Sequence, residues 1–174
     1  SAERATEIAA QLGCPVFRDL DALLAWVKGV SIAPPTPFHH EVGVLALERG
    51  VAVLMEKPIA VDAAQADDLI ARAGRHGVPL HVGQIERFNR AIRAAEPLLD
   101  HPRYIECQRL APFSVRGSDV SVILDLMVHD LDLVLHLTGS AGATDVRATG
   151  GALLSPHVDL ANARIELAGG AVAT

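Results

Sequence analysis

Apolar and polar residues follow one another along the first half of the chain in blocks that predict strands and helices in turn. Short apolar runs at residues 29–33, 51–55 and 80–83 are bounded by glycine and proline, as buried strands are. Helical patterns over residues 36–49 and 62–76 separate these runs. Strands that alternate with helices in this way form a parallel sheet covered by helices, which is the α/β fold class.

Both ends of the chain interrupt this pattern. Residues 2–12 are typical of a helix, residues 15–17 of a short strand and residues 19–25 of a second helix. The chain closes on the apolar residues 171–173 and Thr174, directly after a Gly-Gly turn. We therefore expect further elements of the fold on either side of this chain.

The rhythm changes after Gly83. A domain boundary there gives residues 1–83 and 84–174, the second part having the mixed order of an α+β domain. Its predicted elements are a helix over residues 88–100, a strand over 104–110, a long apolar helix over 120–137, and strands near 146–153, 159–167 and from 171 onward.

Composition and charge narrow the class of protein. Of the 174 residues half are hydrophobic, and 21 acidic against 15 basic side chains give a formal charge of −6. Without a Lys/Arg run, this balance favours neither a nucleic-acid partner nor a membrane surface, and no apolar run approaches the ~20 residues of a membrane span. Cys14 and Cys107 lie far apart with no metal-ligand spacing, so we interpret them as reduced thiols of a cytoplasmic protein.

Ligands of open parallel sheets bind beyond the carboxyl ends of the strands, so residues 34–40, 56–58 and 84–89 should line one crevice. Lys57, within the Glu-Lys-Pro run, could exchange a proton or polarise a carbonyl at the edge of a dry crevice. Two surface charges before a turn are the ordinary alternative. The segment at 34–40 could offer backbone N–H groups to a ligand or serve only as a turn, and residues 84–89 could be a helix-capping loop.

The long apolar helix carries one polar stripe, formed by Asp125, His129, Asp132 and His136. At about 100° per residue these side chains fall within an arc of about 60°. A solvated face is one explanation, although the stripe lacks Lys and Glu, which usually fill such a face. Asp125, one turn before His129, could orient the imidazole for general-base catalysis. A metal site built from the same side chains is the competing chemical hypothesis.

Four segments taken together resemble the glucose-fructose oxidoreductase / inositol dehydrogenase (Gfo/Idh/MocA) family of NAD(P)-dependent sugar oxidoreductases. They are VSIAPPTPFH at 30–39, EKP at 56–58, GQIERFN at 83–89 and DLMVHDLD at 125–132. The resemblance covers essentially the whole chain, and the last two segments are most similar to the branch that acts on UDP-sugars. It implies a partial Rossmann domain followed by a partial α+β open-faced sheet domain. It also implies NAD or NADP as cofactor and hydride transfer between nicotinamide and a secondary alcohol or ketone of a sugar or UDP-sugar.

The resemblance further implies roles for single residues. Lys57 would be the catalytic lysine, and Asp125 and His129 the catalytic pair. Cofactor contacts are implied for Glu56, on the nicotinamide ribose, for Pro58 after a cis peptide bond, and for Pro35, Thr36, His39, Lys57 and Gln84. A diphosphate needs positive charge and bidentate donors, and Arg87, Arg109 and Arg116 are the arginines available near the proposed crevice. We expect substrate contacts from Arg87, Asn89, Arg116 and Asp132, and we expect no metal ion.

The sequence departs from the family pattern because no G-x-G-x-x-G phosphate loop opens any of its helices. That loop would precede Ser1 and much of the large sheet would follow Thr174, so we expect this chain alone to be inactive and to bind NAD very weakly at best. A homo-oligomer through the C-terminal sheet is also implied. Two alternatives stay open: a non-catalytic sugar or nucleotide sensor on the same scaffold, and a metal-dependent hydrolase that uses Asp125, His129 and Asp132.

Overall fold

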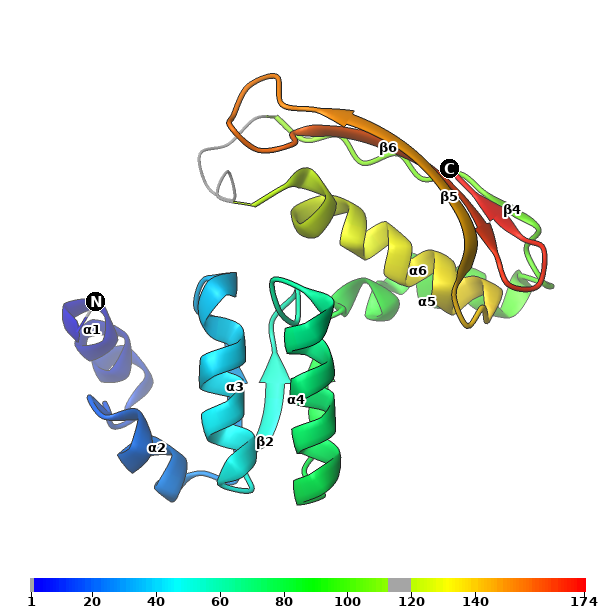
Figure 1. Ribbon diagram of the computed structural model, residues 1–174. Coiled ribbons are helices and arrows are strands. Elements are labelled where there is room, and N and C mark those ends of the chain that lie inside the picture. The colour runs from blue at the N-terminus through cyan, green and yellow to red at the C-terminus, as the bar shows by residue number, and fades with distance from the viewer. Residues whose placement is uncertain (1, 113–119) are drawn as a thin grey trace. The chain divides into compact units, whose positions relative to one another are not determined.

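A computed structural model describes residues 2–112 and 120–174 of the chain (Figure 1). These residues divide into two compact units, Ser1–Gly83 and Gln84–Thr174. Each unit has its own sheet and its own hydrophobic core. None of the described helices combines the length and the apolar character that crossing a membrane requires.

The first unit is built on a three-stranded parallel sheet in the order β1-β2-β3. Its strands are β1 (Gly29–Ile32), β2 (Ala52–Met55) and β3 (Leu80–Val82). Ile32 is paired with Met55 and Met55 with Val82, so the three strands end at the same level. The predicted parallel sheet is therefore confirmed, and the segments that leave its carboxyl ends start side by side.

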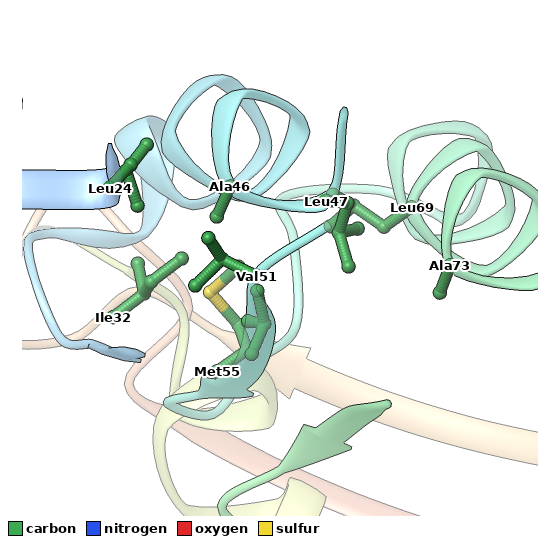
Figure 2. Packing of buried hydrophobic residues seen from close by; sticks show 9 residues of the cluster. Leu24, Ile32, Ala46, Leu47, Val51, Met55, Leu69 and Ala73 are labelled. Carbon is green, nitrogen blue, oxygen red and sulfur yellow. The ribbon is translucent and has the colours of Figure 1, made fainter. Parts of the chain in front are cut away.

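Two helices precede β1, and the helical segments that follow it connect the strands of this unit. They are α1 (Ala2–Leu12), α2 (Leu20–Trp26), the 3₁₀ turn η1 (Thr36–Phe38), α3 (His39–Glu48) and α4 (Ala63–His76). Figure 2 shows Leu47 of α3 beside Leu69 of α4, with Val51 and Met55 close to them in the core. Leu47, Leu69 and Met55 are completely buried, so this contact fixes both helices on the strands.

Helix α4 illustrates how the sequence sets its own boundaries. It begins after Asp62, whose side-chain oxygen accepts the backbone N–H of Gln65 at 2.9 Å. It ends at Gly77, which has a φ of 62°, the left-handed conformation that glycine adopts at least cost. In contrast, the strand predicted over residues 15–17 is wrong, because these residues are irregular and β1 pairs only with β2 among the described strands.

The second unit contains a mixed sheet in the order β4-β7-β6-β5. Its strands are β4 (Tyr104–Ile105), β5 (Ala143–Gly151), β6 (Leu160–Leu167) and β7 (Val172–Ala173). β4 runs parallel to β7, whereas β6 is antiparallel to both β5 and β7. Helix α6 (Val128–Thr138) packs along one face of this curved sheet, with Val134 against Ile165 and Leu167 (Figure 1). The α+β second half is therefore confirmed, although the strand predicted over 104–110 is formed only by Tyr104–Ile105.

Two predicted helices of this unit are less regular than their patterns suggested. The helix expected over residues 88–100 is divided into η2 (Ile85–Phe88), α5 (Arg90–Ala95) and η3 (Glu96–Leu98). Pro97 lacks the N–H that a continuing α-helix requires, so the segment tightens into a 3₁₀ turn there. The helix expected over 120–137 opens with a π-helical turn, η4 (Ile123–Met127), which leads directly into α6.

Candidate functional site

The carboxyl edge of the parallel sheet carries the first group of candidate residues. Glu56 donates its backbone N–H to the carbonyl oxygen of Ile32 at 2.9 Å, and Gly83 donates to that of Met55 at 2.7 Å. These bonds extend the ladder by one residue beyond β2 and β3. The main chain at Glu56 and Gly83 is thereby held as firmly as the strands themselves.

The carboxylate of Glu56 lies over Gly83. A Cβ at residue 83 would stand 3.3 Å from Glu56 Oε2 and 3.4 Å from the carbonyl oxygen of Met55, tighter than most Cβ contacts. Glu56 Oε2 also accepts the backbone N–H of Lys57 at 3.2 Å. Glycine at 83 thus leaves space for an exposed carboxylate at the end of the sheet, with acceptor capacity beyond this one bond.

Lys57 follows Glu56 directly and is half-buried, while Pro58 is buried. The peptide bond between Lys57 and Pro58 is cis, as the resemblance implies. Lys57 is therefore presented by a turn that starts from the level end of β2.

His39 begins α3 with its side chain turned into the protein, where it is 1% exposed. Its Nδ1 lies 2.8 Å from the carbonyl oxygen of Pro58, and its Nε2 lies 2.9 Å from that of Pro34. The ring thus sits between the segment after β1 and the turn after β2. Pro35 and Thr36, the neighbouring candidates, are respectively exposed and half-buried in the same loop.

The second unit holds the polar stripe of the apolar helix, and the structure gives two of its members partners. Asp132 accepts from Nε of Arg87 at 2.7 Å and from Nη2 of Arg87 at 2.5 Å. His136 Nε2 lies 3.1 Å from Oε1 of Glu96. The stripe therefore faces the segment that contains η2 and η3 instead of forming a wholly solvated face.

Arg87 and Asp132, both expected to contact substrate, thus bind each other. The carboxylate of Asp132 raises the pKa of the Arg87 guanidinium, which keeps its positive charge fixed. Asp132, which belongs to the alternative metal set of Asp125, His129 and Asp132, forms a hydrogen bond with Arg87 through each of its two oxygens. Within the described part of the chain, no group of three or more His, Cys, Asp or Glu side chains is placed to hold a metal ion.

Asp125 and His129 lie at the start of the same helix, and both are half-buried. Asp125 belongs to the π turn, in which the N–H of Val128 reaches back to the carbonyl oxygen of Ile123. The uniform 100° per residue assumed for this stripe is therefore wrong in its first turn. Single π turns inside α-helices are frequent at functional sites, and this one contains a candidate catalytic residue, Asp125.

Three further candidates have different positions. Asn89 caps α5, since its Oδ1 accepts the N–H of Ala91 at 3.0 Å while its Nδ2 donates to Glu86. The Oε1 atom of Gln84 is buried and accepts no hydrogen bond from the residues that the structure describes. Arg116 lies outside the described residues.

Arg109 was a candidate from the sequence, but its pairing with Asp130 was not predicted. Arg109 binds Asp130 through Nε and Nη2, with Nη2 to Oδ1 at 2.7 Å, beside a cavity of about 110 Å³ between α6 and the sheet. Cys107 also lines this cavity, and burial, followed by the charge of Asp130, raises the pKa of its thiol. Asp130 and Asp132 are two residues apart, so they project from different sides of α6. This spacing is the one sequence feature that indicates separate partners for the two carboxylates.

The residues at the carboxyl edge fit a nicotinamide nucleotide. Glu56 supplies the exposed carboxylate that a ribose diol requires, above a glycine that leaves room for it. Gln84 supplies a buried amide oxygen, an atom that native proteins normally satisfy with a donor. The described residues do not include the usual backbone donors for the pyrophosphate of this nucleotide, because no described helix opens with a glycine-rich turn.

Several known proteins are similar to this chain in sequence and fold. The profile of an oxidoreductase family with an NAD-binding Rossmann fold matches residues 1–84. The chain is 47% identical over 174 residues to the UDP-N-acetylglucosamine 3-dehydrogenase of Acidithiobacillus ferrooxidans, covering 99% of this chain and 55% of that protein. A solved structure of that dehydrogenase matches with a TM-score of 0.94 at 46% identity, over 99% of this chain and 57% of the other. A myo-inositol dehydrogenase from Streptomyces leeuwenhoekii is 33% identical over 160 residues, which are 87% of this chain and 47% of that protein.

The fold and the relatives place the chain in a class of oxidoreductases that have a nucleotide-binding parallel sheet, and its second unit contains a mixed sheet. The chain belongs to the Gfo/Idh/MocA oxidoreductase family, whose Rossmann fold binds NAD. It spans about half the length of the curated relatives that it matches.

Proposed function

We propose that the full-length protein is an NAD(P)-dependent dehydrogenase that exchanges a hydride between the nicotinamide and a secondary alcohol or ketone of a UDP-sugar. The observation that carries this proposal is the presentation of Lys57 at the level carboxyl edge of the parallel sheet, next to the Glu56 carboxylate. The 47% identity to a UDP-N-acetylglucosamine 3-dehydrogenase supports this sugar nucleotide as the first substrate to test.

The cofactor would be held in part by residues of this chain. Glu56 would accept hydrogen bonds from the nicotinamide ribose, and the buried oxygen of Gln84 would accept one from a donor group of the ligand. The loop containing Pro35 and Thr36 would line the same nucleotide. When bound, the nicotinamide supplies the carbon that accepts or donates the hydride.

Loss of a hydride from carbon requires loss of the hydroxyl proton, so a base must serve that oxygen. We assign the task of accepting this proton to Lys57 and His129. Lys57 can hold or release a proton on Nζ, and its cationic form can polarise a carbonyl in the reverse direction. Asp125, four residues before His129, would act as a positioning residue that favours one orientation of the imidazole.

The test is an absorbance assay of nicotinamide reduction with the purified full-length protein. UDP-N-acetylglucosamine, UDP-glucose, free N-acetylglucosamine and myo-inositol are each offered with NAD and with NADP. We expect turnover with UDP-N-acetylglucosamine, with the free sugar at least ten times poorer because it lacks the charge-assisted diphosphate contacts.

The same assay separates the alternatives. Equal turnover of myo-inositol would place the protein among the neutral-polyol dehydrogenases and contradict the UDP-sugar proposal. Binding of the sugar nucleotide without any turnover would instead identify a sensor. Light scattering on the same preparation tests the proposed homo-oligomer.

A further inference from the structure

The interior ring of His39 touches the main chain on both sides of the proposed cofactor edge. Its Nδ1 faces the carbonyl oxygen of Pro58 at 2.8 Å, and its Nε2 faces the carbonyl oxygen of Pro34 at 2.9 Å. With 1% of its surface exposed, the ring is enclosed by the chain itself. A side chain placed in this way acts on the surrounding backbone and not on a ligand directly.

The position of His39 explains why its ring points inward. His39, Gly43, Ala46 and Leu47 are the buried residues of α3, and their spacing of four, three and one places them on one face of the helix. This face packs on the sheet, with Leu47 in the same core as Met55. His39 is therefore the polar end of a buried helix face, and it lies level with the strand ends.

We propose that His39 is a positioning residue that couples the cofactor loop after β1 to the turn that presents Lys57. Its Nε2 bond fixes the carbonyl of Pro34, just before the loop of Pro35 and Thr36, while its Nδ1 bond fixes the carbonyl of Pro58, directly after Lys57. The kinetic consequences of this inference rest on the proposed function. The two contacts of His39 with the backbone do not depend on that function.

The chemistry of the two contacts makes the inference specific. Both partners are carbonyl oxygens, which only accept, so each contact requires a proton on the facing ring nitrogen. A neutral imidazole carries one N–H and could serve only one carbonyl. The ring donates through whichever nitrogen carries the proton, so the two contacts have to be tested one at a time.

Two isosteric substitutions separate the two bonds. The amide nitrogen of asparagine reaches the place of Nδ1, so His39→Asn keeps a donor for Pro58 and loses the one for Pro34. The amide nitrogen of glutamine reaches the place of Nε2, so His39→Gln keeps a donor for Pro34 and loses the one for Pro58. His40→Asn is the matched control, because His40 instead contacts Asp68 of α4 at 2.7 Å.

The first readout is NMR of the chain without ligand, which does not depend on any activity. We expect His39→Gln to shift mainly the amide signals of Lys57 and Ile59, and His39→Asn to shift mainly those of Ala33 and Thr36. His40→Asn should leave all four signals in place. Equal perturbation of both segments by both variants, or of neither segment, would overturn the proposal.

The second readout is kinetic, in the full-length protein. We expect His39→Gln to lower kcat by about 10 to 100-fold, since small displacements of a catalytic group are costly, with KM for the cofactor little changed. His39→Asn should raise that KM by about 5-fold, the usual effect of one neutral hydrogen bond, with kcat largely kept. Loss of kcat in both variants without this division would contradict coupling by two separate bonds.

A third readout needs no substitution and covers the case in which a variant fails to fold. Long-range ¹H–¹⁵N spectra of the wild-type ring report which nitrogen carries a proton. We expect at least one N–H of the His39 ring in a hydrogen bond to a backbone carbonyl, and a ring without a hydrogen-bonded N–H would overturn the contact. If the wild-type protein oxidises no sugar while the NMR results hold, the proposed function fails and the positioning role of His39 remains.

Discussion

Arg87 binds Asp132 through two parallel hydrogen bonds, across 45 residues of sequence. The Asp132 side chain is 12% exposed and that of Arg87 is 42% exposed, so the pair closes the edge of the contact between η2 and α6. A fork of this kind restricts both partners more than a single surface ion pair does. Arg87 and Asp132, both expected to contact substrate, therefore bind each other in the chain without a ligand.

Removal of this pair should weaken the second unit. We expect Arg87→Ala to lower the free energy of unfolding by about 1 to 2 kcal/mol, since the partner left behind is largely buried while solvent screens the exposed side of the arginine. Urea unfolding of the single variants and of Arg87→Ala with Asp132→Ala gives the interaction energy. Arg147→Ala is the control, because its partner Asp145 lies on an exposed strand, and a change within about 0.5 kcal/mol is expected. Equal losses for the two arginines would show that the fork has no special weight.

Substitution by alanine should destabilise the protein at only one of two adjacent glycines of β5. A Cβ at Gly150 would stand 2.8 Å from the carbonyl oxygen of Leu160 and 3.0 Å from Cγ1 of Val158, whereas nothing lies within 4 Å of one at Gly151. Gly150→Ala should therefore cost about 1 to 3 kcal/mol through displaced backbone. Gly151→Ala should stay within about 0.5 kcal/mol of the wild type. Thermal unfolding monitored by circular dichroism compares them, and similar melting temperatures would contradict the tight approach at Gly150.

Acid should release the loop between β5 and β6. Asp159 accepts the backbone N–H groups of Leu153, Leu154 and Ser155 at 2.8, 2.6 and 2.7 Å, and these bonds hold the pKa of its carboxyl below the ordinary value of 3.8. A lowered native pKa stabilises the fold above the unfolded value, and this stabilisation is lost as pH falls through the native pKa. We expect Asp159→Asn to be less stable than the wild type at neutral pH and the difference to disappear in acid. A difference that does not depend on pH would show that charge is not its cause.

Substitutions of Lys57 distinguish proton transfer by its amine from the effect of its positive charge. In the full-length protein, Lys57→Met and His129→Asn should each lower kcat by about 100-fold or more, because each removes a group that holds a proton in the transition state. Lys57→Arg keeps a cation that cannot be deprotonated in a protein, so it should not restore turnover if Lys57 exchanges a proton. Lys28→Met, at the exposed residue just before β1, is the matched control and should leave kcat unchanged. Restoration of full turnover by arginine would limit Lys57 to an electrostatic role.

The parallel sheet could be predicted because local signals mark each of its elements. Asp62 and Gly77 delimit α4, and the short apolar runs identify the strands without knowledge of their partners. The helix expected over residues 88–100 failed for an equally local reason, the proline at 97, whose effect on the pattern was underestimated.

The contacts within the site could not be predicted in the same way. The pairing of Arg87 with Asp132 depends on how two distant segments pack, and no periodicity contains it. The sequence does indicate that the ring of His39 is buried, since His39 shares a helix face with Gly43 and Leu47. The family resemblance instead implied that His39 contacts the cofactor. The π turn at Ile123–Met127 escapes any analysis that assumes a constant rotation per residue.

That π turn makes the start of this helix a place where chain length can change. A π turn contains one residue more than an α turn, so deletion of Leu124 could be absorbed by tightening the turn, while α6 from Val128 onward stays on its sheet. The same deletion would keep the spacing of four residues between Asp125 and His129, because both follow residue 124. A change in length of one residue at this point is therefore compatible with an unchanged packing of α6 on its sheet.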